Sequence, residues 1–414
     1  MKRGGLLALL TTGHAFEHWY LGLMGPLMPF LAQDLGFSLT QVGVLVTGRA
    51  VFGAFSSAGS GWATDRLGSG RAMLIFCLAG IALLYGGIAF APGFAVLAPI
   101  YWASGLAGQT WHPPSMGLLG EIFRDRKGFA FGIHGTGASL GQSIAPVVAG
   151  YLLLVMNWRQ VILWNMLPLL AVSVMLALWL PSIQPGAQAI EKGAPDTSAL
   201  DWLRQVRDSL LRNPELLAVC FTSGVRTLTQ NVVITFLPFF LVRELGASAG
   251  WVGIALGVFT SASILPETLM GYLSDRIPRQ RILFTGIIVG GLILLFIPAW
   301  GGSAVLLLLL AVLGAFFIST RSVVFALGIE VSPRSLGGSV VGLIFTTNQV
   351  FVGAGSLSCG VLADALGPGA VFWFTGGLVL LSYPLLLLLM RSAAAQRAVA
   401  APAAPEAAPV APAP

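Results

Sequence analysis

Three side chains near the start of the chain have the types and the spacing to do chemistry: His14, Glu17 and His18. At positions i, i+3 and i+4 they share one face of a helix. The same letters spell H-x-x-E-H, a zinc-binding pattern of metalloproteases. The segment also lies inside an apolar run, 6–32, and a charge in hydrocarbon usually marks a substrate or proton pathway. Whether this face is a metal site or part of such a pathway depends on the helices that surround it.

The composition indicates a protein that crosses a membrane many times. Of 414 residues, 56% are hydrophobic and 9% are charged, with a mean hydropathy of +0.86, whereas soluble domains carry about 25% charged residues. Three cysteines, Cys77, Cys220 and Cys359, lie in or beside apolar segments. Their odd number and wide spacing give neither a disulfide framework nor a metal-ligand pattern. The first apolar run has full spanning length and no small-residue cleavage site, so we interpret it as a retained helix.

Apolar runs long enough to span a bilayer, about 20 residues each, predict an all-α integral membrane protein with twelve transmembrane helices. They lie near 6–32, 41–63, 72–91, 94–120, 128–155, 159–180, 215–241, 250–273, 282–299, 303–329, 337–362 and 369–390. The segment between the sixth and seventh runs is polar, and the segment after the twelfth is rich in alanine and proline. The composition of the latter is typical of disorder. The predicted organisation is an N-terminal six-helix half (1–180), a cytoplasmic linker (181–214), a C-terminal six-helix half (215–392) and a disordered tail (393–414).

Lysines and arginines in the loops predict the orientation of the chain in its membrane. Nearly all of them fall on one side, and the other side carries only Arg159 and Arg243. We therefore expect a multi-pass protein of the bacterial inner membrane, with both termini in the cytoplasm. The formal net charge of +6 is then a topology signal and does not indicate nucleic-acid binding.

The two halves repeat each other along the sequence. An offset of 210 residues lays 61–66 (G-W-A-T-D-R) on 271–276 (G-Y-L-S-D-R), and an offset of 209 lays His112 on Arg321. Two parallel six-helix repeats joined by a loop are typical of transporters. In such proteins the substrate site lies near the midplane of the membrane, between the halves.

The loop after the second helix reads G-x-x-x-D-R-x-G-x-x-R over 61–71, and a weaker copy begins at Gly271. This pattern resembles the signature loop of the major facilitator superfamily, and the resemblance extends over all twelve helices. In that family the paired loops latch the cytoplasmic ends of the halves together. The resemblance implies that the charged residues of these loops act in gating, whereas the alternative is that they only fix the topology. They are Asp65, Arg66, Arg71, Glu121, Asp275, Arg276 and Glu330.

The fourth and fifth helices resemble one group within that family. The pattern G-x-x-x-G-x-x-x-A-P over 137–146 is similar to the signature of the family's exporters, although ordinary small-residue packing gives the same spacing. The stretches 111–114 (W-H-P-P) and 134–137 (H-G-T-G) resemble the fosmidomycin-resistance branch of these exporters. Tyr101 stands where drug exporters usually carry an arginine, so the resemblance implies no arginine-based proton relay there.

Polar side chains inside the predicted spans form the candidate site. By the resemblance, helices 1, 4, 7 and 10 line a central cavity, and each carries a charged or titratable group at a similar depth. Guanidinium groups suit carboxylates and phosphates, so we expect a clamp on an anion, unless the arginines only pair with Glu17 or Glu267. Expected substrate ligands are Arg226, Arg321, His112, Gln109, Asn348 and Gln349.

Protons are expected to move through Glu17 and His18, which lie near the middle of the first helix. Four other polar residues have roles that the sequence leaves open between binding, gating and packing. Depth alone places His14, His134 and Glu267 closer to the cytoplasm than His18, and places Arg49 nearer the outer side. These residues are Arg49, His14, His134 and Glu267.

The sequence thus predicts a secondary transporter and no enzyme: proton-coupled export of a small anionic organic compound by one chain acting alone in the bilayer. No cofactor is expected, and ATP is not implied because the loop G-x-x-x-x-G-K-[ST] is missing. Proton-coupled uptake of an organic anion such as a carboxylate suits the arginines equally well. A metal-cation transporter using the histidines is disfavoured by three arginines inside the spans, and an intramembrane metallohydrolase leaves the twelve-helix repeat unexplained.

Overall fold

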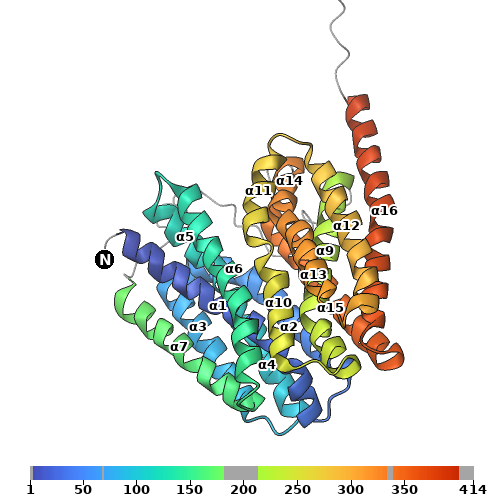
Figure 1. Ribbon diagram of the computed structural model, residues 1–414. Coiled ribbons are helices and arrows are strands. Elements are labelled where there is room, and N and C mark those ends of the chain that lie inside the picture. Colours follow the sequence, from blue (N-terminus) through green and yellow to red (C-terminus); the bar gives the residue numbers. More distant parts are fainter. Residues whose placement is uncertain (1–2, 68–69, 181–212, 333–338, 401–414) are drawn as a thin grey trace, which may run out of the picture.

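The computed structural model describes residues 3–67, 70–180, 213–332 and 339–400, which form helices joined by short turns, with no strand among them. Within these ranges the side chains of 58–67, of most residues after 384 and of single positions such as Pro113 and Lys127 are not described. Figure 1 shows two groups of helices, blue to green for the N-terminal half and yellow to red for the C-terminal half. The chain therefore has the two-halved, all-helical arrangement that the sequence predicts.

The N-terminal half runs from α1 to α7, and its helices start and stop where the local sequence directs. Asn157 caps the last of them, because its side chain accepts from the Gln160 amide while the Gln160 side chain reaches back to the Asn157 amide. The helices are α1 (Arg3–Asp34), α2 (Leu39–Leu67), α3 (Gly70–Ala89), α4 (Phe94–Gln109), α5 (His112–Ile122), α6 (Lys127–Leu152) and α7 (Trp158–Trp179).

The C-terminal half runs from α9 to α16. Asn213 caps its first helix, since its side chain accepts from the amide of Leu216 and Pro214 follows at the first helical position. The helices are α9 (Pro214–Phe239), η2 (Phe240–Glu244), α10 (Ala249–Ser261), α11 (Ile264–Ser274), α12 (Arg279–Trp300), α13 (Val305–Phe317), η3 (Ile318–Thr320), α14 (Arg321–Val331), α15 (Ser339–Leu366) and α16 (Ala370–Ala400).

The internal repeat appears in the backbone as well as in the letters. Gly36, between α1 and α2, has a φ of +70°, and Gly246, between η2 and α10, has a φ of +63°. These two glycines are 210 residues apart, which is the offset of the sequence repeat. A positive φ strongly favours glycine, so the same turn recurs at the same place in each half.

Three predicted spans are interrupted near their middle, which the sequence did not predict. The fourth span is divided into α4 and α5, the eighth into α10 and α11, and the tenth into α13, η3 and α14. At the first break the amides of Thr110 and Trp111 donate to carbonyls three residues back, at 3.2 and 3.5 Å, which tightens the chain before Pro113 and Pro114. His112 opens α5 and Arg321 opens α14, so two residues that the repeat makes equivalent both stand at a helix break.

Eight helical stretches of the described chain are long and apolar enough to cross a membrane. The remaining predicted spans correspond to α1, α4 with α5, α6 and α16. The last helix is longer than expected: α16 continues to Ala400 and includes the first residues of the predicted tail. These residues are rich in alanine, which is the best helix former. Residues 401–414, and 181–212 of the predicted linker, lie outside the described residues.

Close packing of α6 against α1 holds the helix that carries Glu17. Gly141 allows this approach, since a Cβ built there would overlap the carbonyl oxygen of Ala15. Gly137 does the same against Thr11. The glycine spacing on the fifth span is therefore used at least for packing against α1.

We expect Gly141→Ala to lower the thermal unfolding midpoint of the purified protein, because overpacking costs roughly 1–3 kcal/mol. Gly132→Ala is the matched control on the same helix, since a Cβ there would meet nothing within 4 Å. Alanine is the better helix former, so this control should unfold at an equal or higher temperature. Equal midpoints for the two variants would contradict the packing role of Gly141.

The two halves touch mainly at one end of the bundle, which we call the closed end: the end with the turns at Gly36, Asn157, Gly246 and Gly367. There α2 packs on α15 and α6 packs on α10. Close backbone approaches occur between Gly43 and Ser356 and between Gly150 and Gly253. Figure 1 shows the halves diverging toward the other end, where α5 and α11 lie.

A carboxylate of one half caps a helix of the other at the closed end. Asp364 of α15 accepts from the amides of Leu39 at 2.8 Å and Thr40 at 2.7 Å, the first residues of α2. A negative charge at a helix N-terminus is stabilising. The hydroxyl of Thr47 adds a bond across the halves by donating to the carbonyl of Gly353 at 2.7 Å.

We expect Asp364→Ala to increase the population in which the closed end opens, because its contacts exist only while the halves meet there. Double electron–electron resonance between spin labels on α2 and α15 should show a larger share of long distances. Asp34→Ala is the control at the same end, since Asp34 pairs with Arg159 inside the N-terminal half and its pKa is lowered by that hydrogen bond and by one from Trp158. An unchanged distance distribution for Asp364→Ala would contradict the capping role.

Candidate functional site

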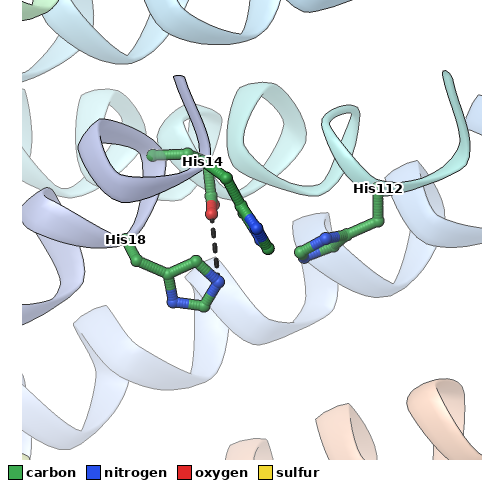
Figure 2. Close-up of side chains that lie close together, drawn as sticks. His14, His18 and His112 are labelled. Atoms are coloured by element: carbon green, nitrogen blue, oxygen red, sulfur yellow. Dashed lines mark ion pairs between the residues drawn. The ribbon is translucent and has the colours of Figure 1, made fainter. Parts of the chain in front are cut away.

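All four histidines of the chain meet in one cluster inside the N-terminal half. His14 stacks on His134 with ring centroids 4.1 Å apart and lies edge-on to His18 at 4.9 Å and to His112 at 5.3 Å. Trp111 extends this stack on both His14 and His134. Figure 2 shows the rings of His14, His18 and His112 converging from α1 and α5.

Glu17 forms the acidic part of this cluster. Its carboxylate Oε2 lies 3.2 Å from Nε2 of His18, and the side chain is almost fully buried. Arg49 of α2 lies within electrostatic range of Glu17 and donates a hydrogen bond to the hydroxyl oxygen of Tyr85. Its guanidinium carbon also lies 5.9 Å from the ring centre of Tyr101. Arg49 therefore belongs to the same buried network as Glu17.

The structure brings His14 and His134, whose roles the sequence left open, into the cluster around His18. His14 lies one turn before His18 on α1, and its ring contacts the rings of both His18 and His134. Nδ1 of His14 also donates to the carbonyl oxygen of His134 at 2.9 Å, so α1 and α6 are held in register. Counting along one helix could not show this contact between two helices.

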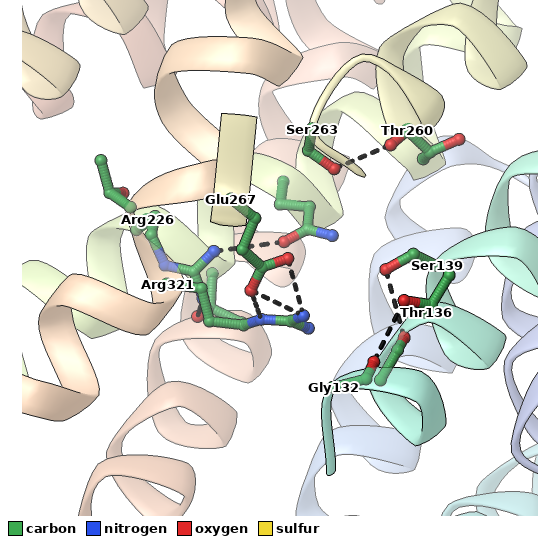
Figure 3. Close-up of polar contacts among 12 residues, drawn as sticks. Gly132, Thr136, Ser139, Arg226, Thr260, Ser263, Glu267 and Arg321 are labelled. Carbon is green, nitrogen blue, oxygen red and sulfur yellow. Dashed lines mark hydrogen bonds and ion pairs between the residues drawn. The ribbon is translucent and has the colours of Figure 1, made fainter. Parts of the chain in front are cut away.

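A second polar group lies in the C-terminal half, around Arg321. Its guanidinium binds both oxygens of Glu267, with Nε to Oε1 at 3.0 Å and Nη2 to Oε2 at 3.1 Å. This is the pairing that the sequence left open as an alternative to anion binding. In Figure 3, Arg226, Arg321 and Glu267 gather on one side, and Ser139 and Thr136 of α6 lie opposite them.

Arg226 has a different environment from Arg321. The side chain is buried in the middle of α9, with 5% exposed. Its guanidinium donates to Gln230 at 3.4 Å and to Thr227 at 3.1 Å, and its Nε has no partner. Within the described part of the chain, no carboxylate forms an ion pair with Arg226. A buried guanidinium with an unused donor is a candidate anion-binding group.

A pocket lies between the halves, next to Arg321. The enclosed space in it is about the size of one water molecule. The wall contains Ser139 and Gln142 from α6 and Gln230 from α9, and the rest comes from Thr260, Ser263, Glu267, Ile318 and Arg321. The hydroxyl groups of this wall, on Ser139, Thr260 and Ser263, were not selected from the sequence, because small hydroxyl groups in a span give no signal of which face they occupy.

The expected amide ligands lie between the halves but outside this pocket wall. Gln109 of α4 and Gln349 of α15 both approach Gly53 of α2, within 3.3 and 2.8 Å of where a Cβ would stand. Asn348 is buried, and its Oδ1 has no partner among the described residues. The three amides therefore lie where a substrate or another helix could use their hydrogen bonds.

The two polar groups face each other across the boundary between the halves. Arg321 lies within electrostatic range of both His18 and His112, and it also interacts with Arg226. The ring of His112 faces Phe345 of α15, with centroids 6.4 Å apart. The candidate site thus has a wall of histidines with Glu17 on one side and a wall of arginines with Glu267 on the other.

Four side chains of the histidine wall have the composition of a metal site. The possible ligand atoms of His14, Glu17, His18 and His112 lie within 4.8 Å of one another. Zinc binds its nitrogen and oxygen ligands at about 2.0–2.2 Å, so these side chains would need to close in on an ion. Arg49 and Arg321 are within electrostatic range of the cluster, and their charges disfavour a bare dication.

The predicted gate residues are only partly described. Glu330 at the end of α14 pairs with Arg279, which also binds Asp275 at 3.2 Å. Arg276, to which the sequence assigned a gating role, has its guanidinium carbon 4.1 Å from the ring centre of Tyr272. The pairing of Glu330 follows from the position of Arg279, which opens α12 and so faces the end of α14, whereas Arg276 lies in the preceding turn.

The N-terminal copy of this gate has one described arginine contact. Arg71, in the first turn of α3, donates to the carbonyl oxygen of Ala177 in α7, which ties two helices of the same half. Glu121 lies in the last turn of α5. The side chains of Asp65 and Arg66 lie outside the described residues.

Comparisons with known proteins place the whole chain in one group. The sequence pattern of the Major Facilitator Superfamily matches residues 10–229 and again 219–413. The chain is 21% identical to the fosmidomycin resistance protein of Escherichia coli, over 87% of this chain and 86% of that one. It is 26% identical to sugar efflux transporter B of Salmonella typhimurium, over 88% and 92%.

Solved structures agree on the fold. A bacterial homolog of the human lysosomal transporter Spinster, in an inward-facing and unoccupied conformation, superimposes with a TM-score of 0.77. The match covers 95% of this chain and 98% of that chain, at 16% sequence identity. The predicted twelve-helix, two-repeat fold and the predicted resemblance to this family are both confirmed.

Proposed function

Since the chain belongs to the Major Facilitator Superfamily, we propose that this transporter exports a small organic anion across the bacterial inner membrane in exchange for protons. Members of this family are transporters, so the chain is a multi-pass membrane transporter and not an enzyme. Its substrate is a small molecule that crosses within the membrane. The anionic cargo, the direction and the proton coupling are the parts that we propose here.

Arg226 carries the proposal. A buried guanidinium normally pairs with a carboxylate, because an uncompensated charge in a low-dielectric interior is costly. Among the described residues, Arg226 donates to an amide and a hydroxyl and has one unused donor, and Glu267 acts on it without forming an ion pair. A carboxylate, phosphate or phosphonate of the cargo would complete its shell. Gln230 binds Arg226 and also lines the pocket, so one side chain connects this guanidinium with the pocket wall.

Arg321 and Glu267 supply a second, switchable position for the anion. An arriving anion can share the guanidinium of Arg321, because Glu267 engages it from one edge and the side chain is 38% exposed. His112 lies across from Arg321 and can donate to the same cargo. Gln109, Asn348 and Gln349 extend the set of hydrogen-bonding groups toward the closed end.

Protons are proposed to move through Glu17 and His18, which contact each other inside the histidine wall. Movement of the halves then exposes this wall to either side of the membrane. With both termini in the cytoplasm, the closed end faces outward and this structure is open inward. The Arg279 pair with Glu330, and the copy formed by Asp65, Arg66, Arg71 and Glu121, act at the inner gate.

Transport by proteoliposomes tests direction and coupling together. Loaded vesicles with an acid exterior should lose a radiolabelled organic anion faster than vesicles without a pH gradient. Accumulation of that anion inside right-side-out vesicles under the same gradient would instead establish uptake. The exporter-like pattern over 137–146 supports export, and the arginines fit both directions.

A metal-cation transporter is the second candidate, and the four converging ligands favour it. Titration of the purified protein with Zn²⁺ or Ni²⁺ in a calorimeter separates the two. Binding of one equivalent that is lost in His14→Ala and kept in Arg226→Gln would replace the anion proposal with this one. We expect no such binding, because Arg49 and Arg321 oppose a dication.

A further inference from the structure

We propose that the transported anion is flat and unsaturated, with its charged group on Arg226 and Arg321 and its planar body between His112 and Phe345. This inference rests on the proposed function, and it adds the shape and chemistry of the uncharged part of the cargo. It follows from the arrangement of rings beside the arginines, which anion binding alone does not require.

His112 and Phe345 present parallel rings from opposite halves of the protein. Their planes differ by 14° and their centroids lie 6.4 Å apart, at the wide end of the range for aromatic pairs. Atoms in contact across a flat layer lie about 3.5 Å apart, so a planar group between two parallel rings needs about 7 Å. The 6.4 Å between centroids includes any sideways offset of the rings, so the proposal requires the halves to move apart for a planar group to enter.

The ring of Phe345 is open to such a ligand. The side chain of Phe345 is 37% exposed. It keeps this exposure although it lies at the boundary between the halves, opposite His112. In an interface that served packing alone, we would expect a neighbouring side chain to cover this ring. Instead, exposed aromatic area remains at the boundary that the cargo must occupy.

The rings and the arginines belong to one surface. Phe325 lies four residues after Arg321 on α14, so the two share a helix face, and its ring packs against Phe345 at 5.2 Å. Arg321 also lies within electrostatic range of His112. A cargo whose anionic group reaches Arg321 from the pocket therefore has aromatic faces on both sides of its body.

Two pairs of acids that differ only in flatness test this inference. Benzoate and cyclohexanecarboxylate carry the same charge and the same ring size, and so do cinnamate and 3-cyclohexylpropanoate. We expect calorimetry on the full-length protein in detergent to show about tenfold tighter binding of the flat member in each pair, the contribution of favourable ring stacking. This ratio needs no variant.

Variants then locate the effect. Phe345→Leu should bring the two members of each pair to equal affinity, by weakening only the flat one, whereas Phe345→Tyr should keep the preference. Phe296→Leu is the control, because Phe296 is an exposed aromatic residue on α12, outside the site. A preference that survives Phe345→Leu would overturn the assignment to this ring.

The outcomes separate the inference from the function on which it rests. Equal affinities within each pair, with both acids lost in Arg226→Gln, would overturn the flat cargo and leave anion transport standing. Binding that is unaffected by Arg226→Gln would overturn the anion site itself. Binding of no member of either pair would overturn both proposals.

Discussion

Arg226→Gln should weaken binding of the transported anion by at least about 30-fold. Truncating one partner of a buried, hydrogen-bonded charge pair costs about 2–5 kcal/mol, and the cargo is the partner that completes this pair. Glutamine keeps a polar group beside Gln230 and Thr227, so the helix loses a charge and little volume. Binding is measured by calorimetry and transport by counterflow in proteoliposomes.

Arg243→Gln is the control for this experiment. Arg243 follows on the same span, in η2, but it is exposed near the closed end and lies over the ring of Phe239 at 5.1 Å. We expect this variant to bind and transport as the unmodified protein does. Full transport by Arg226→Gln, or equal losses in both variants, would contradict the role that we assign to Arg226.

Glu17→Gln should remove proton-driven transport while leaving exchange of substrate for substrate intact. A carboxylate can gain and lose a proton, and an amide cannot. In the variant the pH gradient can therefore no longer drive the conformational cycle. We expect transport driven by a pH gradient to fall to background, at least about 10-fold below the unmodified protein. Counterflow under equal pH on both sides should retain most of its rate.

Glu244→Gln controls for the loss of a carboxylate as such. Glu244 ends η2 and accepts from the amide of Gly369 at 2.7 Å, and glutamine can still accept there. This variant should keep both activities. Two results would contradict the coupling role of Glu17: a variant Glu17→Gln that still responds to the pH gradient, or one that loses counterflow to the same extent as driven transport.

Much of the fold was predictable because its signals repeat along the chain. Apolar runs gave the spans, and the offset of 210 residues gave the two halves, which the matching turns at Gly36 and Gly246 reproduce. The helix breaks were not predictable, since 94–120 and 303–329 read as continuous apolar runs. A break depends on how α4 and α13 pack against their neighbours, and composition carries no record of that packing.

The candidate site was predictable in type but not in pairing. Charged residues inside a span are few, so Arg226, Arg321 and Glu17 were selected from the sequence alone. Which carboxylate meets which guanidinium depends on the rotation of two helices relative to each other. Thus the sequence left Arg321 open between an anion and Glu267, and it assigned gating roles to Arg276 and Glu330 without identifying Arg279, which pairs with Glu330 in the structure.

The gathering of every histidine into one cluster gives this protein built-in reporters. The chain has four histidines in 414 residues, and their rings touch one another around His14. Isotope labelling of histidine alone would therefore give a nuclear magnetic resonance spectrum in which each imidazole signal comes from this site. Cargo, protons and movement of the halves could then be followed at four neighbouring positions without introducing any foreign label.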